Sequence, residues 1–188
     1  MKILLLIALS LVVLSVKAQA PPKLVLDSCL TLRAMSAKVS LVDINNTDIY
    51  EEEDQIEGRA TFYQLHKGIR FGYVTDDRRG DEIVFGRRHM KIKSAIVIGK
   101  GRPERLSRPE LGFWAIIEAE GKRFLCVAST FDGIGRSGSF QNIHFAYILP
   151  VSHPQRKDTS TKLDIFYTVG DIRKIGRRQG KQKVNATP

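Results

Sequence analysis

Residues 111–151 read LGFWAIIEAEGKRFLCVASTFDGIGRSGSFQNIHFAYILPV, and this stretch decides the fold class. Apolar, β-branched and aromatic residues dominate Phe113–Ala119, Lys122–Thr130 and Phe140–Leu149, and this composition is typical of strands. Glu120-Gly121 forms a two-residue connection whose glycine can adopt the positive φ that tight hairpin turns require. The stretch therefore predicts a β-hairpin followed by a third strand.

Outside this stretch, three segments are expected to be loops: Asn45–Gly58, Gly99–Glu110 and the polar, proline-bearing Ser152–Lys162. Asn45–Gly58 is acidic and lacks apolar periodicity, and Gly99–Glu110 contains two prolines that would interrupt a strand. About nine or ten short, mostly antiparallel strands with few or no helices predict a single all-β sandwich or barrel. We expect the strands at Lys23–Arg33 and Ala37–Ile44 to form a hairpin. The remaining strands are predicted from apolar residues at a period of two: Lys23–Arg33, Ala37–Ile44, Arg59–Leu65, Ile69–Thr75, Glu82–Phe85, Met90–Ile98 and Leu163–Val169.

The two ends of the chain differ from its interior. Residues 1–20 resemble a bacterial export signal, with Lys2, an apolar run of about fourteen residues and the small-x-small cleavage site Ala18-Gln19-Ala20. Because this run is shorter than the roughly twenty residues of a membrane span, we expect a cleaved leader and a secreted or periplasmic protein without a transmembrane segment. Residues 21–170 are then a single β domain. Residues 171–188, rich in Lys and Arg with little to bury, are predicted to be a disordered basic tail.

The chain contains two cysteines, Cys29 and Cys126, both within apolar patterns. Export to an oxidising compartment favours a disulfide between them, whereas two buried free thiols are the alternative. A disulfide that closes so long a loop stabilises a fold by about 4–5 kcal/mol in the chain-entropy description.

Positive charge is concentrated in two places. Loss of Lys2 and Lys17 with the leader lowers the formal charge from +10 to +8, of which the tail carries +5 and residues 21–170 only +3. Lys91 and Lys93 are two residues apart and share a face if Met90–Ile98 is one strand. We define the basic stripe as the candidate binding residues Arg87, Arg88, Lys91, Lys93, Lys100, Arg102, Arg105 and Arg108.

An exposed basic stripe is suited to phosphate, sulfate or uronate groups. Two other interpretations remain open: lysines protect an edge strand from pairing with another molecule, or the acidic loop around residues 48–57 neutralises the stripe. No aromatic residues accompany the bases of the tail, so the sequence predicts no specific nucleic-acid partner.

A glycine-rich loop provides a second candidate binding surface. Its main-chain N–H groups and one arginine can converge on an anion. A strand rather than a helix is predicted after it, so the dinucleotide-binding arrangement is excluded, and a single carboxylate is too few for strong calcium binding. An ordinary hairpin connection is the alternative. The candidate residues of this glycine loop are Asp132, Gly133, Gly135, Arg136, Ser137 and Asn142.

The sequence carries no catalytic, metal or cofactor signature. A triad can be written from Ser137 or Ser139 with His144 and Asp132, but no nucleophile-elbow motif is present. The histidines are scattered singly and no C-x-x-C or H-x-H pair occurs, so no metal site and no cofactor is predicted.

Three hypotheses follow from the sequence. The first is a non-enzymatic exported β domain that binds an anionic partner, such as a glycan, lipopolysaccharide, another polyanion or an envelope surface. The second is a secreted glycan-active hydrolase or lyase that uses Asp132, His144 and acids from residues 48–57. The third is a structural or assembly subunit of a cell envelope. The sequence does not decide the oligomeric state.

Overall fold

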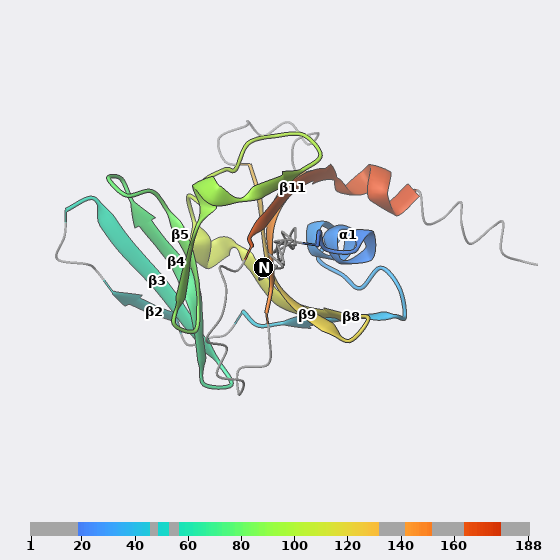
Figure 1. Ribbon diagram of the computed structural model, residues 1–188, viewed down its shortest axis with the longest axis horizontal. Coiled ribbons are helices and arrows are strands. Elements are labelled where there is room, and N and C mark those ends of the chain that lie inside the picture. The colour runs from blue at the N-terminus through green and yellow to red at the C-terminus, as the bar shows by residue number, and fades with distance from the viewer. Residues whose placement is uncertain (1–18, 46–48, 53–56, 132–141, 152–163, 178–188) are drawn as a thin grey trace, which may run out of the picture.

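The computed structural model of the chain describes residues 19–45, 49–52, 57–131, 142–151 and 164–177. These residues form two packed β-sheets with one helix on the outer face of the larger sheet (Figure 1). The arrangement is a sandwich and not a closed barrel, and it confirms the predicted all-β class.

The larger sheet, sheet A, has the strand order β1-β8-β9-β10-β11-β7. Its neighbours pair antiparallel, except that β7 runs parallel to β11. The β8–β9 turn follows the prediction, with positive φ at both Glu120 (53°) and Gly121 (72°). The strands of sheet A are β1 (Val39–Asp43), β8 (Phe113–Ala119), β9 (Lys122–Thr130), β10 (Ile143–Pro150), β11 (Phe166–Asp171) and β7 (Ile96–Ile98).

The smaller sheet, sheet B, is antiparallel with the order β2-β3-β4-β5-β6. Its edge strand β2 lies within Asn45–Gly58, so the prediction that this whole segment is a loop is wrong. The acidic composition of the segment gave no indication of β2, because β2 pairs with β3 through its backbone. The strands of sheet B are β2 (Ile49–Glu52), β3 (Arg59–His66), β4 (Ile69–Asp76), β5 (Glu82–Phe85) and β6 (Arg88–Lys91).

Facing side chains of the two sheets form the main core. Trp114 of β8 is fully buried there, with its ring centroid 5.5 Å from that of Phe71 in β4 and 6.2 Å from that of Phe62 in β3. Offset and tilted aromatic pairs of this kind stabilise a core beyond their buried area. The core therefore joins the predicted central hairpin to the middle of sheet B.

Helix α1 (Lys23–Thr31) packs on the outer face of sheet A (Figure 1), so the prediction of a strand at Lys23–Arg33 is wrong. Val25, Ser28 and Cys29 are buried and recur at helical spacing, which the loose alternation of leucines had concealed. The predicted hairpin with the following segment is also wrong, because β1 pairs with β8 instead.

A disulfide joins Cys29 of α1 to Cys126 of β9, with a Cα–Cα distance of 5.7 Å, as the sequence predicted. The two cysteines lie within a second apolar cluster that fills the space between α1 and sheet A. The bridge therefore fixes the helix to the centre of the larger sheet.

The segment Met90–Ile98 is not one strand. It divides into β6, the 3-10 helix η1 (Ile92–Ser94) and β7, because the chain crosses here from the edge of sheet B to the edge of sheet A. The amide of Ile92 donates to the carbonyl of Asp81 (3.0 Å), and the Ser94 hydroxyl donates to the carbonyl of Lys91 (2.7 Å). The expectation that Lys91 and Lys93 share a face of one strand is therefore wrong.

Residues 172–177, at the start of the predicted tail, form a short helix in which Ile175 is buried against the α1 layer. The prediction of disorder does not hold for this segment, and residues 178–188 lie outside the described residues, as does the predicted loop at residues 152–162. No helix in the described ranges is long and apolar enough to cross a membrane.

Candidate functional site

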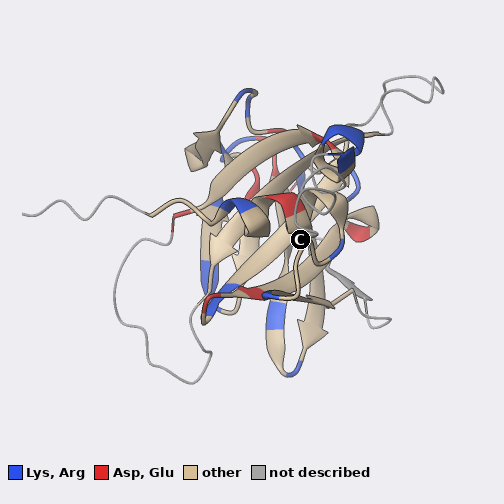
Figure 2. Cartoon of the chain, turned by 90° about the vertical axis from the view of Figure 1, so that its right-hand side faces the viewer, with Lys and Arg blue, Asp and Glu red and all other residues tan. Residues whose placement is uncertain are grey.

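The basic stripe is distributed over three segments. Arg87 and Arg88 lie at the β5–β6 turn, and Lys91 and Lys93 flank the crossing between the sheets. Figure 2, which colours Lys and Arg blue, shows basic residues in separate places around the molecule. The other four stripe residues lie on the connection between β7 and the 3-10 helix η2 (Pro109–Leu111): Lys100, Arg102, Arg105 and Arg108.

One residue of the stripe is neutralised within the fold. The Arg105 guanidinium lies 2.9 Å from a carboxylate oxygen of Asp77 and 2.9 Å from one of Asp81, which is buried. Partial burial lowers the pKa of Arg105, but these two carboxylates outweigh burial and raise that pKa above its ordinary value. Arg105 therefore holds its connection against the β4–β5 turn and is not free to bind a ligand.

Buried hydroxyl groups fix the same connection to the sandwich. The Tyr73 hydroxyl donates to the Asp81 carboxylate (2.9 Å) and accepts from the amide of Leu106 (3.1 Å). The Tyr147 hydroxyl donates to the carbonyl of Glu104 (2.6 Å). Burial raises the pKa of both tyrosines well above the ordinary range, so both remain neutral donors. These bonds position the residues that follow, including Arg108.

Most of the other stripe residues, unlike Arg105, are exposed and form no ion pair with a described residue. Arg88 is half-buried, with a further interaction of its own. The other six are exposed, and in the part of the chain that the structure describes none of them forms an ion pair: Arg87, Lys91, Lys93, Lys100, Arg102 and Arg108.

A pocket of about 490 Å³ opens beside Arg108, where β8 begins, β9 ends and β10 begins. It combines one guanidinium, one imidazole and three hydroxyl groups with apolar side chains. This volume lies within the range of sites for small ligands. The pocket is lined by Leu32, Ser107, Arg108, Leu111, Phe113, Ala128, Ser129, Thr130 and His144.

One polar group of this pocket, the imidazole of His144, is held by a contact to a distant segment. The ring of His144, 8% exposed, has Nδ1 2.7 Å from the carbonyl oxygen of Leu30 at the end of α1. Because a carbonyl can only accept, Nδ1 carries a proton, and Nε2 is the acceptor of the neutral ring or a second donor when the ring is protonated. The orientation of this imidazole is therefore fixed by the fold.

The opposite wall is formed by η2. The Trp114 indole donates to the carbonyl of Pro109 (2.9 Å), and the amide of Leu111 donates to the carbonyl of Arg108 (3.0 Å). Leu111 itself is 69% exposed, which is unusual for a large apolar side chain anchored so close to the core. The buried indole thus fixes the backbone on which Arg108 and Leu111 are displayed.

The chemistry of this pocket favours an anion that also carries an apolar surface. A guanidinium and hydroxyl groups donate hydrogen bonds to carboxylate, sulfate or phosphate oxygens, and charge-assisted bonds of this kind are strong. Leu111 and Phe113 provide contact for a sugar ring or another less polar group. No group of three or more metal-ligating side chains occurs within the described ranges.

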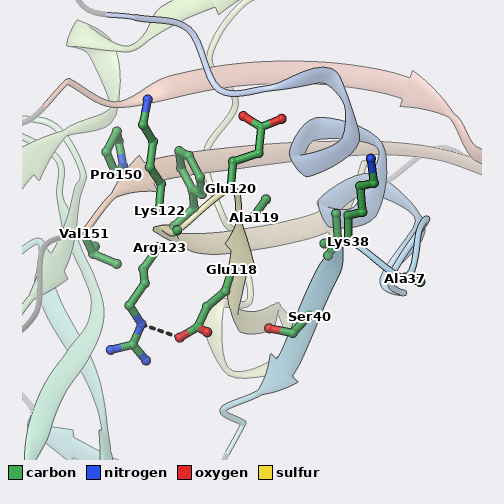
Figure 3. A pocket seen from close by; sticks show the side chains of 13 residues that line it. Ala37, Lys38, Ser40, Glu118, Ala119, Glu120, Lys122, Arg123, Pro150 and Val151 are labelled. Carbon is green, nitrogen blue, oxygen red and sulfur yellow. Dashed lines mark ion pairs between the residues drawn. The ribbon is translucent and has the colours of Figure 1, made fainter.

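A larger hollow, of about 620 Å³, surrounds the β8–β9 turn, and its charged lining residues, Lys38, Glu118, Glu120, Lys122 and Arg123, carry one net positive charge. Figure 3 shows Arg123 and Glu118 pointing toward one another, with Nε 2.7 Å from the carboxylate oxygen. The Lys122 ammonium donates to the side chain of Gln19 (3.0 Å), and Glu120 adds a second acid. Because Arg123 is already paired with Glu118 and no fixed imidazole lines it, this hollow is a weaker candidate.

The predicted glycine loop falls almost entirely outside the described residues, since 132–141 are not described. Asn142, its last candidate, immediately precedes β10 and is half-buried with an interaction partner. Sequence reasoning named Arg108 and His144 in separate hypotheses and did not identify Ser107, Ser129 or Thr130 as partners. Serine and threonine at strand ends carry too little signal to be recognised alone.

Comparisons of the chain with protein-family models, with curated proteins and with solved structures find no match.

Proposed function

We propose that the protein is an exported, non-enzymatic β domain that binds an anionic partner: a glycan, lipopolysaccharide or another polyanion. The leader-like N-terminal residues and the Cys29–Cys126 disulfide support export to an oxidising compartment. The six exposed bases that form no ion pair with any described residue support an anionic partner, because such charges remain available to attract one.

The observation that carries the proposal is the pocket in which Arg108 and His144 come together. One sulfate, carboxylate or phosphate group would accept hydrogen bonds from Arg108 and the Thr130 hydroxyl, and from the Ser129 hydroxyl in place of its present donation to the carbonyl of Thr130 (3.3 Å). Lys100 and Arg102, exposed on the connection that leads to Arg108, would then contact neighbouring groups of a longer polyanion. In this proposal the connection between β7 and η2 is the main binding segment.

The proposal is tested by titrating the protein with heparin oligosaccharides and with lipopolysaccharide over a series of salt concentrations. The logarithm of the affinity should fall linearly with the logarithm of the salt concentration, because bound counterions are released. Arg108→Gln should weaken binding about tenfold or more, since it removes a charge-assisted hydrogen bond.

Arg87→Gln is the matched control, because it removes the same charge from an exposed position at the β5–β6 turn. It should change the affinity by only a small factor. Binding that does not respond to salt, or that is absent at low salt, would contradict the proposal. Equal losses of affinity in the two variants would still support an anionic partner, but they would contradict the assignment of its binding to the pocket beside Arg108.

A glycan-active hydrolase or lyase is the second candidate, favoured by the fixed orientation of His144. An imidazole whose Nδ1 donates to a main-chain carbonyl has the geometry of an oriented general base. Asp132 lies outside the described residues, and of the acids from residues 48–57 that this hypothesis also used, Glu51 and Glu52 lie on β2, in the other sheet from His144. Sulfated and uronate-bearing polysaccharides incubated with the protein should become shorter under this hypothesis, and His144→Gln, whose amide can still donate to Leu30, should abolish the shortening. Unchanged chain length with the wild type rejects it.

A further inference from the structure

A third hollow lies at the β3–β4 turn, lined by residues of both sheets, and it shares Glu118, Arg123 and Val151 with the hollow at the β8–β9 turn. Its volume is about 330 Å³, and we call it the inter-sheet slot. It shares no lining residue with the pocket beside Arg108. The walls of the slot are apolar side chains from both sheets: Ile44, Ile69, Phe71, Phe85, Ile116 and Val151.

The slot continues the main core to the surface. Phe71 and Ile44 are buried with exposures of 0% and 2%, whereas Ile69 and Phe85 are only half-buried at its edge. Half-buried apolar side chains around an opening leave surface that a bound apolar group would remove from water. A concave, mostly apolar site with few polar groups is the usual form of a small-molecule site.

The mouth of the slot is cationic. Lys67 is exposed on the β3–β4 turn, and Arg123 of β9 lies opposite, paired at 2.7 Å with Glu118. These three side chains together carry one net positive charge. His66 lines the slot together with Lys67 and Arg123, and burial, followed by the charges of these two cations, lowers its pKa.

We propose that the inter-sheet slot binds a small amphipathic anion, with its aliphatic or aromatic body between the sheets and its acidic group at Lys67 and Arg123. The apolar walls favour an aliphatic or aromatic body, and the excess of positive charge at the mouth favours a negatively charged head group. This is a separate site from the one proposed beside Arg108, and it takes a ligand of different shape. Arg108→Gln should therefore leave it unaffected.

The wild-type protein tests the proposal through its single tryptophan. Phe71 lines the slot, and the ring centroid of Trp114 lies 5.5 Å from that of Phe71. Titration with ω-bromo-octanoate should quench Trp114 fluorescence saturably, and unlabelled octanoate should reverse the quenching. In calorimetry, octanol should bind several-fold more weakly than octanoate, because it lacks the charge.

Three exposed or half-buried positions provide variants. Lys67→Gln should weaken octanoate binding about two- to fivefold, as expected for one exposed ion pair. Glu118→Gln should strengthen it by a similar factor, because Glu118 competes with the ligand for Arg123. Ile69→Trp should fill the slot and weaken binding about tenfold or more.

Leu65→Trp is the control for bulk, since Leu65 is 40% exposed and does not line the slot. It should bind octanoate as the wild type does, which calorimetry measures independently of the added indole. Absence of saturable binding by the wild type overturns the proposal. Equal binding of octanol and octanoate overturns the assignment of an anionic head group, and so does an unchanged affinity in both Lys67→Gln and Glu118→Gln.

Discussion

The buried tyrosine hydroxyls show how single residues organise this sandwich. Tyr73 has two partners, the Asp81 carboxylate and the Leu106 amide, whereas the buried hydroxyl of Tyr167 has none within the part of the chain that the structure describes. A buried polar group without a partner costs its full desolvation free energy. Both side chains are fully buried, so we expect their hydroxyls to act on stability in opposite directions.

Removing each hydroxyl should therefore change the free energy of unfolding in different directions. Tyr73→Phe should lower it by about 1–3 kcal/mol, because Asp81 and the Leu106 amide each lose a partner. Tyr167→Phe should leave it unchanged or raise it. Urea denaturation of both variants at neutral pH measures the difference, and equal losses would contradict this account of the core.

The same tyrosines predict how stability depends on alkaline pH. Burial raises the pKa of Tyr73, Tyr147 and Tyr167 above the ordinary value near 10. Above about pH 10 the unfolded chain releases tyrosine protons that the folded chain keeps, so the free energy of unfolding falls as pH rises. Each tyrosine should contribute about 1.4 kcal/mol per pH unit.

Denaturation curves between about pH 9 and 11 test this dependence. Tyr167→Phe is the internal control, since it removes one of the three raised groups and should make the dependence shallower by roughly a third. Stability that does not change across this interval would show that the three hydroxyls titrate normally.

At the scale of elements, α1 and the disulfide form one unit. Cys29 is buried between the helix and sheet A and bonded to Cys126, and His144 holds the carbonyl of Leu30 at the end of the same helix. A nine-residue helix is too short to be stable alone in water, so α1 depends on these attachments.

Replacing both cysteines by serine should lower the free energy of unfolding by about 2–5 kcal/mol. The loss should be greatest in α1, whose amides should exchange with solvent much faster, while those of β8 and β9 remain protected by the main core. Hydrogen exchange followed by mass spectrometry resolves the two regions. Exchange in α1 that matches the wild type would show that the helix does not depend on the bridge.

The sequence predicted some elements well and others poorly, for physical reasons. The bounds of β5, β8 and β9 were predicted correctly, because dense apolar composition and a glycine turn leave one interpretation. Lys23–Thr31 was misread, since leucines at several spacings satisfy both a period of two and a helical period. The β2 segment was missed because its pairing is made by the backbone.

At the scale of the whole molecule, contacts between distant segments decide what a local pattern cannot. The fold class was predictable, but the crossing at η1 from one sheet to the other was not, because it depends on which edges the sheets expose. Arg108 and His144 were both noted in the sequence. Their common pocket arises only because the end of α1, the residues at η2 and three strands of sheet A meet.

The distribution of positive charge over the molecule is also decided by the fold and not by the local sequence. The basic stripe is continuous in the sequence, yet the fold divides it among a turn, a crossing and a long connection, and uses Arg105 internally. The central claim is therefore that anion binding is localised beside Arg108 and not spread over the stripe.

The most direct test is to titrate the isotope-labelled protein with a sulfated disaccharide and follow backbone amide chemical shifts. The account predicts that the largest saturable changes occur at Ser107, Arg108, Ser129 and Thr130, and that Arg108→Gln removes them. Changes centred on Arg87, Lys91 and Lys93, or small changes spread over all exposed bases, would contradict it.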